Sequence, residues 1–384
     1  MLKIARAANA YSAHRLVKLW AGRYLPDLSS LPTQKYSFPA TELIECATPA
    51  GRSRTVKRLR SLLLIQCELA GLEANSLFTY IPNIVNLSEA RRIAPYVKRV
   101  YEAVFEIYQQ QDPPSTYLKY IDASSQLFSR IALPSLMLPA IQQLSEALDP
   151  VLLELQETYI SAQDPRTIAF LTTQFHFTTK NILQKITPCE QILITPYLNF
   201  VEEQICIPWQ RVCAAAATSS NFETLALIER LLPETHAIAN RVFERSVVNF
   251  TDHTSRRGSL SQPAVAASTL RDLNMFQGYL HLCLLENSMN AIEHELLPLC
   301  LTVFPNVSVR WDLVRFMLRS LECELFSLLT PAQIRLLSPY TQALQTLFAN
   351  ADQANAELST LFSDRISHFS NGIPQSRNGA HYQN

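Results

Sequence analysis

The chain has 384 residues, of which 48% are hydrophobic and only 17% are charged, so it can bury a large core and is not a disordered chain. Seven Gly against 22 Pro are too few Gly for the turns and phosphate-binding loops of sheet proteins and nucleotide-binding α/β folds. The net charge is zero, but residues 1–60 hold 11 Lys/Arg and 3 Asp/Glu, whereas the other residues hold 22 and 30. This asymmetry predicts an anionic partner for the N-terminal end, or docking of that end onto the acidic remainder.

The cysteines and the apolar runs indicate in which cellular compartment the protein is expected. None of the eight Cys forms a Cys-x-x-Cys pair, and no apolar run approaches the length of a membrane span. We therefore expect buried free thiols, no transmembrane segment and a soluble cytoplasmic protein.

Helical periodicity runs through most of the chain, and many helix starts carry an N-cap residue followed by Pro. Pro suits the first helical position because its missing N–H has no partner there. Such steps precede Pro49, Pro113, Pro150, Pro165, Pro188, Pro196, Pro331 and Pro339. In chain order we expect helices at residues 2–22, 53–71, 88–110, 115–131, 135–147, 150–162, 165–185, 196–217, 221–231, 234–250, 268–289, 291–302, 309–328, 339–350 and 352–367. The sequence predicts an all-α protein of one or more multi-helix bundles with Pro-capped corners and no sheet.

Three stretches share one pattern: NLSEARRIAPY at 86–96, TPCEQILITPY at 187–197 and TPAQIRLLSPY at 330–340. Each predicts a cap, about two helical turns, and a Pro-Tyr corner that opens a long helix. Their unequal separations exclude a fixed-period solenoid. A recurrent solution for a helix corner explains them, with duplication of a helical unit as the alternative.

Linker composition divides the chain. We expect a basic N-terminal helix and Pro-bearing linker at 1–41, a helical bundle at 42–250, a C-terminal bundle at 264–368 and a disordered tail at 369–384. The polar loop at 251–263 and the region near residue 186 are the candidate boundaries.

The first helix combines basic and aromatic residues. Arg15, Lys18 and Trp20 are candidates for contact with a membrane or a partner, because basic residues beside aromatic rings suit an anionic lipid surface or a phosphate backbone. The alternatives are an organelle presequence and a terminal helix docked on the acidic body through Leu16, Leu19, Trp20 and Tyr24.

A second basic cluster opens the helix predicted at 53–71. Positive charge there opposes the helix dipole unless an anion binds the free N–H groups. This cluster predicts a nucleic-acid or acidic-partner patch, and the alternative is a solvated basic face paired with acidic residues elsewhere. Its members are Arg52, Arg54, Lys57, Arg58 and Arg60.

The loop from His253 to Ser259 is the best internal candidate for binding an anion, through Arg256 and Arg257. The same residues match a basophilic kinase site with Ser259 as acceptor, a match that also arises by chance. The Thr269 to Asp272 stretch that follows predicts an N-cap, with Asp272 in a capping role.

Four residues suggest a small pocket after Pro196. Cys206, Trp209 and Cys213 lie on one side of the predicted helix, and Pro208 should interrupt and bend it after Ile207. A bend lined by these residues and Glu202 could shape the pocket. The alternative is that the thiols belong to the core.

Motifs for chemistry are missing from the sequence. It has no Gly-x-Gly-x-x-Gly, Walker loop, His-Glu-x-x-His or Gly-x-Ser-x-Gly, and its helical carboxylates lack the Glu-x-x-His spacing of a carboxylate-bridged metal site. We therefore expect no catalytic residues, metal or cofactor.

Two stretches carry a resemblance: VEEQICIPWQRVCAAAA at 201–217 and STLRDLNMFQGYLHLCLLE at 268–286. They resemble segments of an uncharacterised all-helical protein family of cyanobacteria, over about the C-terminal half of the chain. The resemblance implies a bacterial cytoplasm and supplies no activity.

These observations favour a non-enzymatic regulatory or scaffold protein that acts through contacts with a protein partner or with itself. One alternative is a nucleic-acid-binding regulator that uses the basic residues of 1–60. Another is a peripheral membrane protein attached by its first helix. A third is an enzyme or pigment-binding protein with a pocket near Trp209 and Cys213.

Overall fold

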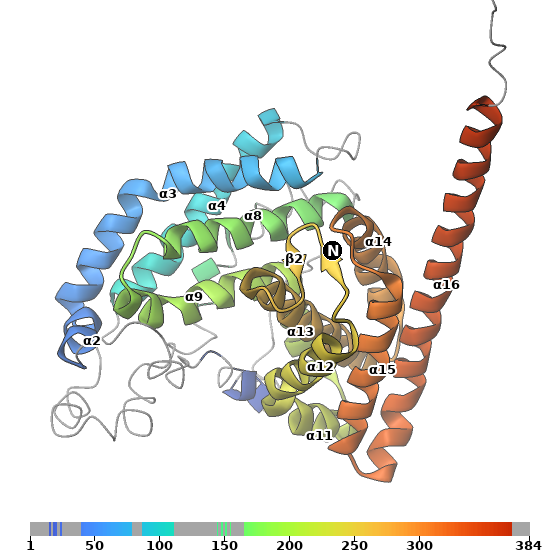
Figure 1. Cartoon of the computed structure of the whole chain (residues 1–384). Coiled ribbons are helices and arrows are strands. Elements are labelled where there is room, and N and C mark those ends of the chain that lie inside the picture. The colour runs from blue at the N-terminus through green and yellow to red at the C-terminus, as the bar shows by residue number, and fades with distance from the viewer. Residues whose placement is uncertain are drawn as a thin grey trace, which may run out of the picture.

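The computed structural model describes residues 40–78, 87–110 and 165–370, together with residues 15, 16, 18–20, 24, 144, 147, 148, 150, 151 and 154. Figure 1 shows an assembly of helices with one small hairpin. The helices are α2 (Ala40–Ala47), α3 (Pro49–Phe78), α4 (Leu87–Gln109), α8 (Pro165–Leu183), α9 (Pro188–Cys206), α10 (Trp209–Thr218), α11 (Phe222–Leu231), the 3-10 turn η3 (Leu232–Glu234), α12 (Thr235–Asn249), α13 (Pro263–Glu286), the π-helical turn η4 (Ile292–Leu296), α14 (Leu297–Asn306), α15 (Trp311–Ser327) and α16 (Pro331–Ser370).

The all-α class is confirmed, with one small addition. Within the described ranges, the only strands are β1 (Thr254–Ser255) and β2 (Gly258–Ser259), which pair antiparallel inside the loop predicted at 251–263. Gly258 allows this tight turn because its φ of 116° lies in a region that L-residues rarely adopt. The prediction of no sheet therefore misses a hairpin with two residues in each strand. Strands this short do not show as an alternating apolar pattern.

Helices that lie on opposite sides of the predicted domain boundaries pack against each other. In Figure 1, α3 lies along one outer edge of the molecule and α16 along the opposite edge. α3 packs on α4 and α8, and α13 contacts α9, α10, α11, α12 and α16. α8 also contacts α14, and α12 contacts α15. Helices that precede the 251–263 loop thus pack directly on helices that follow it.

Several predicted Pro-capped helix starts are confirmed. α3, α8, α9 and α16 begin at Pro49, Pro165, Pro188 and Pro331. Two of the related stretches form the same reciprocal cap: the Thr187 hydroxyl and the Glu190 carboxylate each accept the other residue's backbone N–H, and Thr330 and Gln333 do the same.

The predicted Pro-Tyr corners are wrong. Pro95, Pro196 and Pro339 lie inside α4, α9 and α16 instead of opening new helices. A Pro in a helix interior costs about 3 kcal/mol. Around Pro196, burial of neighbouring side chains such as Tyr197 and Leu198 offsets that cost, so the helix continues.

Other predicted boundaries also shift. α13 begins at Pro263 and not near residue 268, and one helix, α16, replaces the two predicted at 339–350 and 352–367. The helices expected at 115–131, 135–147 and 150–162 lie almost entirely outside the described residues, as do most of the N-terminal linker and of the 369–384 tail. Among the helices described, none is both long enough and apolar enough to cross a membrane.

Candidate functional site

The described residues of the N-terminal segment are docked on the helical body. Trp20 was a candidate for membrane or partner contact, but it is fully buried and stacks on Trp209, with ring centroids 3.9 Å apart and an interplanar angle of 13°. Leu16 and Tyr24, which the sequence pattern placed on one face with Trp20, are also buried, as the alternative of a docked segment predicts. Trp20 therefore contacts the protein's own core.

Polar contacts hold the same segment in place. The Arg15 guanidinium lies 3.2 Å from the Glu229 carboxylate on α11, and the Tyr24 hydroxyl donates a hydrogen bond to Glu203 on α9. Lys18 is exposed. The basic N-terminal segment thus meets acidic side chains of the body, as one explanation of the charge asymmetry requires.

Arg52 does not belong to a surface patch. Its side chain is only 2% exposed and lies over the Tyr108 ring, 4.6 Å from the centroid. Nε donates to the Ala47 carbonyl and Nη1 to the Tyr108 carbonyl, at the C-terminal ends of α2 and α4. Because helix C-termini carry partial negative charge, Arg52 satisfies two of them at once. The prediction that it binds an external anion is wrong.

Most of the remaining basic cluster on α3 is ion-paired within the chain. Arg54 pairs with Glu45 at 2.6 Å, Arg58 with the buried Glu190 at 2.9 Å and Arg60 with Glu106 at 2.7 Å, whereas Lys57 is exposed. These contacts match the alternative of a basic face paired with acidic residues. They reduce the charge that α3 offers to a nucleic acid.

The outer face of α3 carries exposed apolar residues instead. We call Leu64, Ile65, Leu69 and Leu72 the α3 apolar stripe. Their exposures are 41%, 54%, 44% and 45%. Among the described residues, only Phe222 and Val248 are other large hydrophobic side chains exposed to this degree. The stripe could not be predicted from the sequence, because its Leu and Ile residues continue the apolar pattern of the buried face.

Three of the four pocket candidates belong to the core. Cys206, Trp209 and Cys213 are buried, and burial raises the pKa of all seven thiols for which a shift is resolved, that of Cys67 to about 12. Pro208 lies between α9 and α10, so the predicted helix is interrupted there and continues as a second helix. Gly278 of α13 faces this break, because a Cβ at Gly278 would lie 2.5 Å from the Ile207 side chain.

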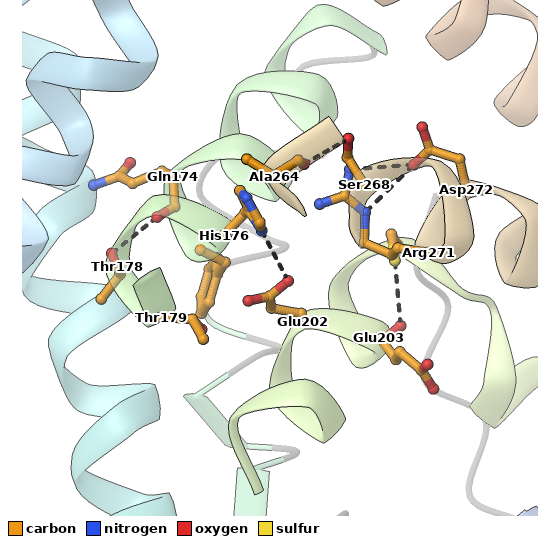
Figure 2. A network of polar contacts seen from close by, with 12 residues as sticks. Gln174, His176, Thr178, Thr179, Glu202, Glu203, Ala264, Ser268, Arg271 and Asp272 are labelled. Carbon is orange, nitrogen blue, oxygen red and sulfur yellow. Dashed lines mark hydrogen bonds and ion pairs between the residues drawn. The ribbon is translucent and has the colours of Figure 1, made fainter. Parts of the chain in front are cut away.

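Glu202, the fourth pocket candidate, belongs to a charged junction of α8, α9, α13 and the hairpin, shown without Arg257 in Figure 2. His176 Nδ1 lies 3.3 Å from a Glu202 oxygen, and His176 Nε2 lies 3.4 Å from Arg257 Nη2. A guanidinium can only donate, so Nε2 accepts and Nδ1 carries the hydrogen that Glu202 accepts. Arg271 donates Nε and Nη2 to one Asp272 oxygen, at 3.3 and 3.1 Å.

The electrostatics of the junction follow from its burial. Burial favours the neutral form of Glu202, but the hydrogen bond from His176 and the electrostatic attraction of His176 and Arg271 outweigh it and lower the pKa of Glu202. Burial raises the pKa of Asp272 despite its contact with Arg271. Burial and the neighbouring Arg271 together lower the pKa of Arg257. Arg257 is thus a cation held where its charge is disfavoured.

The predicted capping role of Asp272 is wrong. α13 begins at Pro263, so Asp272 lies inside the helix, and the Thr269 hydroxyl donates to the Val265 carbonyl within it. The true start, Gln262-Pro263, lacks a side-chain cap and gave no strong signal in the sequence. Arg271 and His176 could not be predicted as site residues, because only the packing of α8 and α13 against α9 brings them to the junction.

Two hollows adjoin the junction, and Arg271 lines both. A groove of about 550 Å³ is lined by Tyr24, His176 and Glu202, among others. A cavity of about 120 Å³ lies beyond Arg257, between the hairpin, α13, α14 and α15. The loop predicted to bind an anion therefore contributes Arg257 to a cavity.

The other residues of that loop have separate roles. Arg256 is exposed, and its backbone N–H donates to the Val307 carbonyl at 3.0 Å. The Ser259 hydroxyl lies 3.0 Å from that of Ser261, and Ser259 is half-buried in β2. Its role as a phosphoacceptor stays a prediction.

In the part of the chain that the structure describes, no group of three or more His, Cys, Asp or Glu could hold a metal ion. No family model, curated protein or solved structure matches this chain. The resemblance to a cyanobacterial family stays a prediction, and the function is argued from this chain alone.

Proposed function

We propose that the protein is a non-enzymatic regulatory or scaffold protein that acts through protein–protein contacts made by the α3 apolar stripe. The single observation that carries this proposal is the placement of four large, exposed apolar side chains on one helix. Leu64, Ile65, Leu69 and Leu72 span about two helical turns on the side of α3 that faces away from α4 and α8. A concentrated apolar stripe is typical of a docking surface, whereas isolated exposed residues are not.

The stripe offers a useful amount of binding free energy. Full burial of one Leu or Ile side chain contributes about 1.5–3 kcal/mol, and these residues still expose about half of that surface. Covering all four therefore contributes on the order of 4 kcal/mol before the costs of association. That is a secondary but specific part of a protein interface, and it suits a partner helix with its own apolar stripe.

The alternatives receive less support from the geometry. Arg52 is buried, and Arg54, Arg58 and Arg60 pair with carboxylates of the chain, which weakens the case for a nucleic-acid surface on α3. Trp20 packs on Trp209, which weakens the case for membrane attachment by the first helix. Self-association through the stripe belongs to the proposal and is separated by experiment.

The test compares a stripe variant with a matched control. Ile65→Glu combined with Leu69→Glu places two charges in the stripe, and Val248→Glu places a charge at a more exposed apolar site on α12. Light scattering after size exclusion reports self-association, and co-purification from the native cell reports another protein. We expect the double variant to lose the dimer or the partner while Val248→Glu keeps it. Retention by both variants would overturn the proposal.

A further inference from the structure

The cavity behind Arg257 has one apolar end and one charged end. Its apolar wall includes Val303 and Phe304 from α14 and Leu313 and Met317 from α15. Its polar end holds Arg257 from the hairpin, with Arg271 and Asp272 from α13. A partly enclosed, mostly apolar space with a few convergent polar groups has the composition of a small-molecule site.

The charges at the polar end favour an anion. Arg271 is engaged by Asp272, so these two charges offset each other. Arg257 contacts Nε2 of His176 and the Phe177 ring, and no carboxylate among the described residues lies within ion-pair distance of it. Among the groups that line the polar end, Arg257 is therefore the cation without an ion-pair partner, and its guanidinium has N–H donors to spare.

His253 supplies an independent sign of an unfilled site. Its side chain lines the cavity and is only 1% exposed, and neither ring nitrogen has a hydrogen-bond partner among the described residues. Burial and the charge of Arg310 lower the pKa of His253, so its ring is neutral and offers one donor and one acceptor. Buried polar atoms without partners are rare in folded proteins, because each lacks the hydrogen bonds it would make in water.

We propose that this cavity binds a small amphipathic carboxylate, with its carboxylate at Arg257 and its hydrocarbon part against α14 and α15. A monoanion matches the one unpaired cation Arg257, whereas a phosphate dianion would bring a second negative charge that this cation does not balance. A cavity of about 120 Å³ suits a chain of about four to six carbon atoms, since an engineered apolar cavity of about 150 Å³ in another protein takes up benzene. His253 also lines the cavity, and its ring can donate a hydrogen bond to a carboxylate oxygen.

Calorimetric titration of the full chain tests the proposal directly. The ligands are sodium acetate, butyrate, hexanoate and decanoate at constant ionic strength, and hexan-1-ol is the neutral analogue of hexanoate. We expect the affinity to rise from acetate to hexanoate and to fall for decanoate, which exceeds the cavity. Hexan-1-ol should bind at least about 10-fold more weakly than hexanoate, because it lacks the charge that Arg257 meets. Absence of hexanoate binding, or equal binding of hexan-1-ol, would overturn the proposal.

Two variants locate the site. Arg257→Gln should weaken hexanoate binding about 10-fold or more, while Arg256→Gln, a change of the same charge at the neighbouring exposed residue, should leave it unchanged. His253→Phe should also weaken binding, and in the ligand-free protein it should raise the denaturation midpoint, because it removes two unpartnered nitrogens. Equal hexanoate affinities for wild type, Arg257→Gln and His253→Phe would refute this location. If a variant misfolds, the chain-length series on the wild-type protein still tests whether the cavity binds a carboxylate.

Discussion

Glu190 joins two helices through one buried carboxylate, and its removal is a demanding test of the fold. It forms the reciprocal cap of α9 with Thr187, accepts the Thr55 hydroxyl at 2.7 Å and pairs with Arg58 at 2.9 Å. A buried hydrogen bond to a charged group contributes about 1.5–3 kcal/mol, and loss of a cap costs about 1 kcal/mol. The Arg58 guanidinium is half exposed, so we count its pair below 1 kcal/mol.

Glu190→Ala should therefore lower the free energy of unfolding by about 3 kcal/mol. The related cap at Thr330 supplies the matched control, because Gln333 makes the same contacts with its N-cap on an exposed helix start. Gln333→Ala should cost about 1 kcal/mol or less. Urea titrations followed by circular dichroism measure both variants. Equal losses for the two would refute the view that Glu190 connects α9 to α3.

Three further predictions concern side chains that sequence patterns place poorly. Trp20→Ala should expose Trp209 and shift its fluorescence to longer wavelength, and an unshifted spectrum would contradict the stacked arrangement. Arg52→Met should cost about 2–3 kcal/mol in urea titrations because it frees two helix C-termini, whereas Arg54→Met should cost under 1 kcal/mol, and similar values would disprove this role. The pKa of His253 is lower in the folded chain than the unfolded value of 6.5, so the native state binds fewer protons and stability falls as pH drops through that range. His253→Phe should reduce the loss of stability between about pH 7 and pH 5, unlike His294→Phe at an exposed site.

The helix class and several helix starts could be predicted because they depend on local chemistry. Thr187-Pro188 and Thr330-Pro331 specify a cap whatever surrounds them, and the structure forms both. Pro196 shows the limit of that argument. The local penalty of Pro predicts a break, but burial of the neighbouring side chains keeps α9 continuous, and no single-sequence pattern reports that burial.

The candidate site residues likewise differ in how far the sequence alone predicts their role. Arg52 and Arg54 are alike in the sequence. In the structure, Arg52 is buried and donates to carbonyls at the ends of α2 and α4, whereas Arg54 is exposed and pairs with Glu45. Arg257 was predicted from its loop to meet an anion, and the structure places it in a cavity wall. Arg271 could not be predicted to line the same cavity, because its position depends on how α13 packs beside the hairpin.

The most direct measurement of the proposed function places a photo-crosslinking amino acid at single positions on the surface. The crosslinker replaces Leu69 within the α3 apolar stripe in one protein and Val248 on α12 in another, since both sites are exposed and apolar. After irradiation in the native cell, we expect a discrete crosslinked species from position 69, either a dimer of this chain or a complex with another protein, and none from position 248. Discrete crosslinks from position 248 with none from position 69 would contradict a contact through α3.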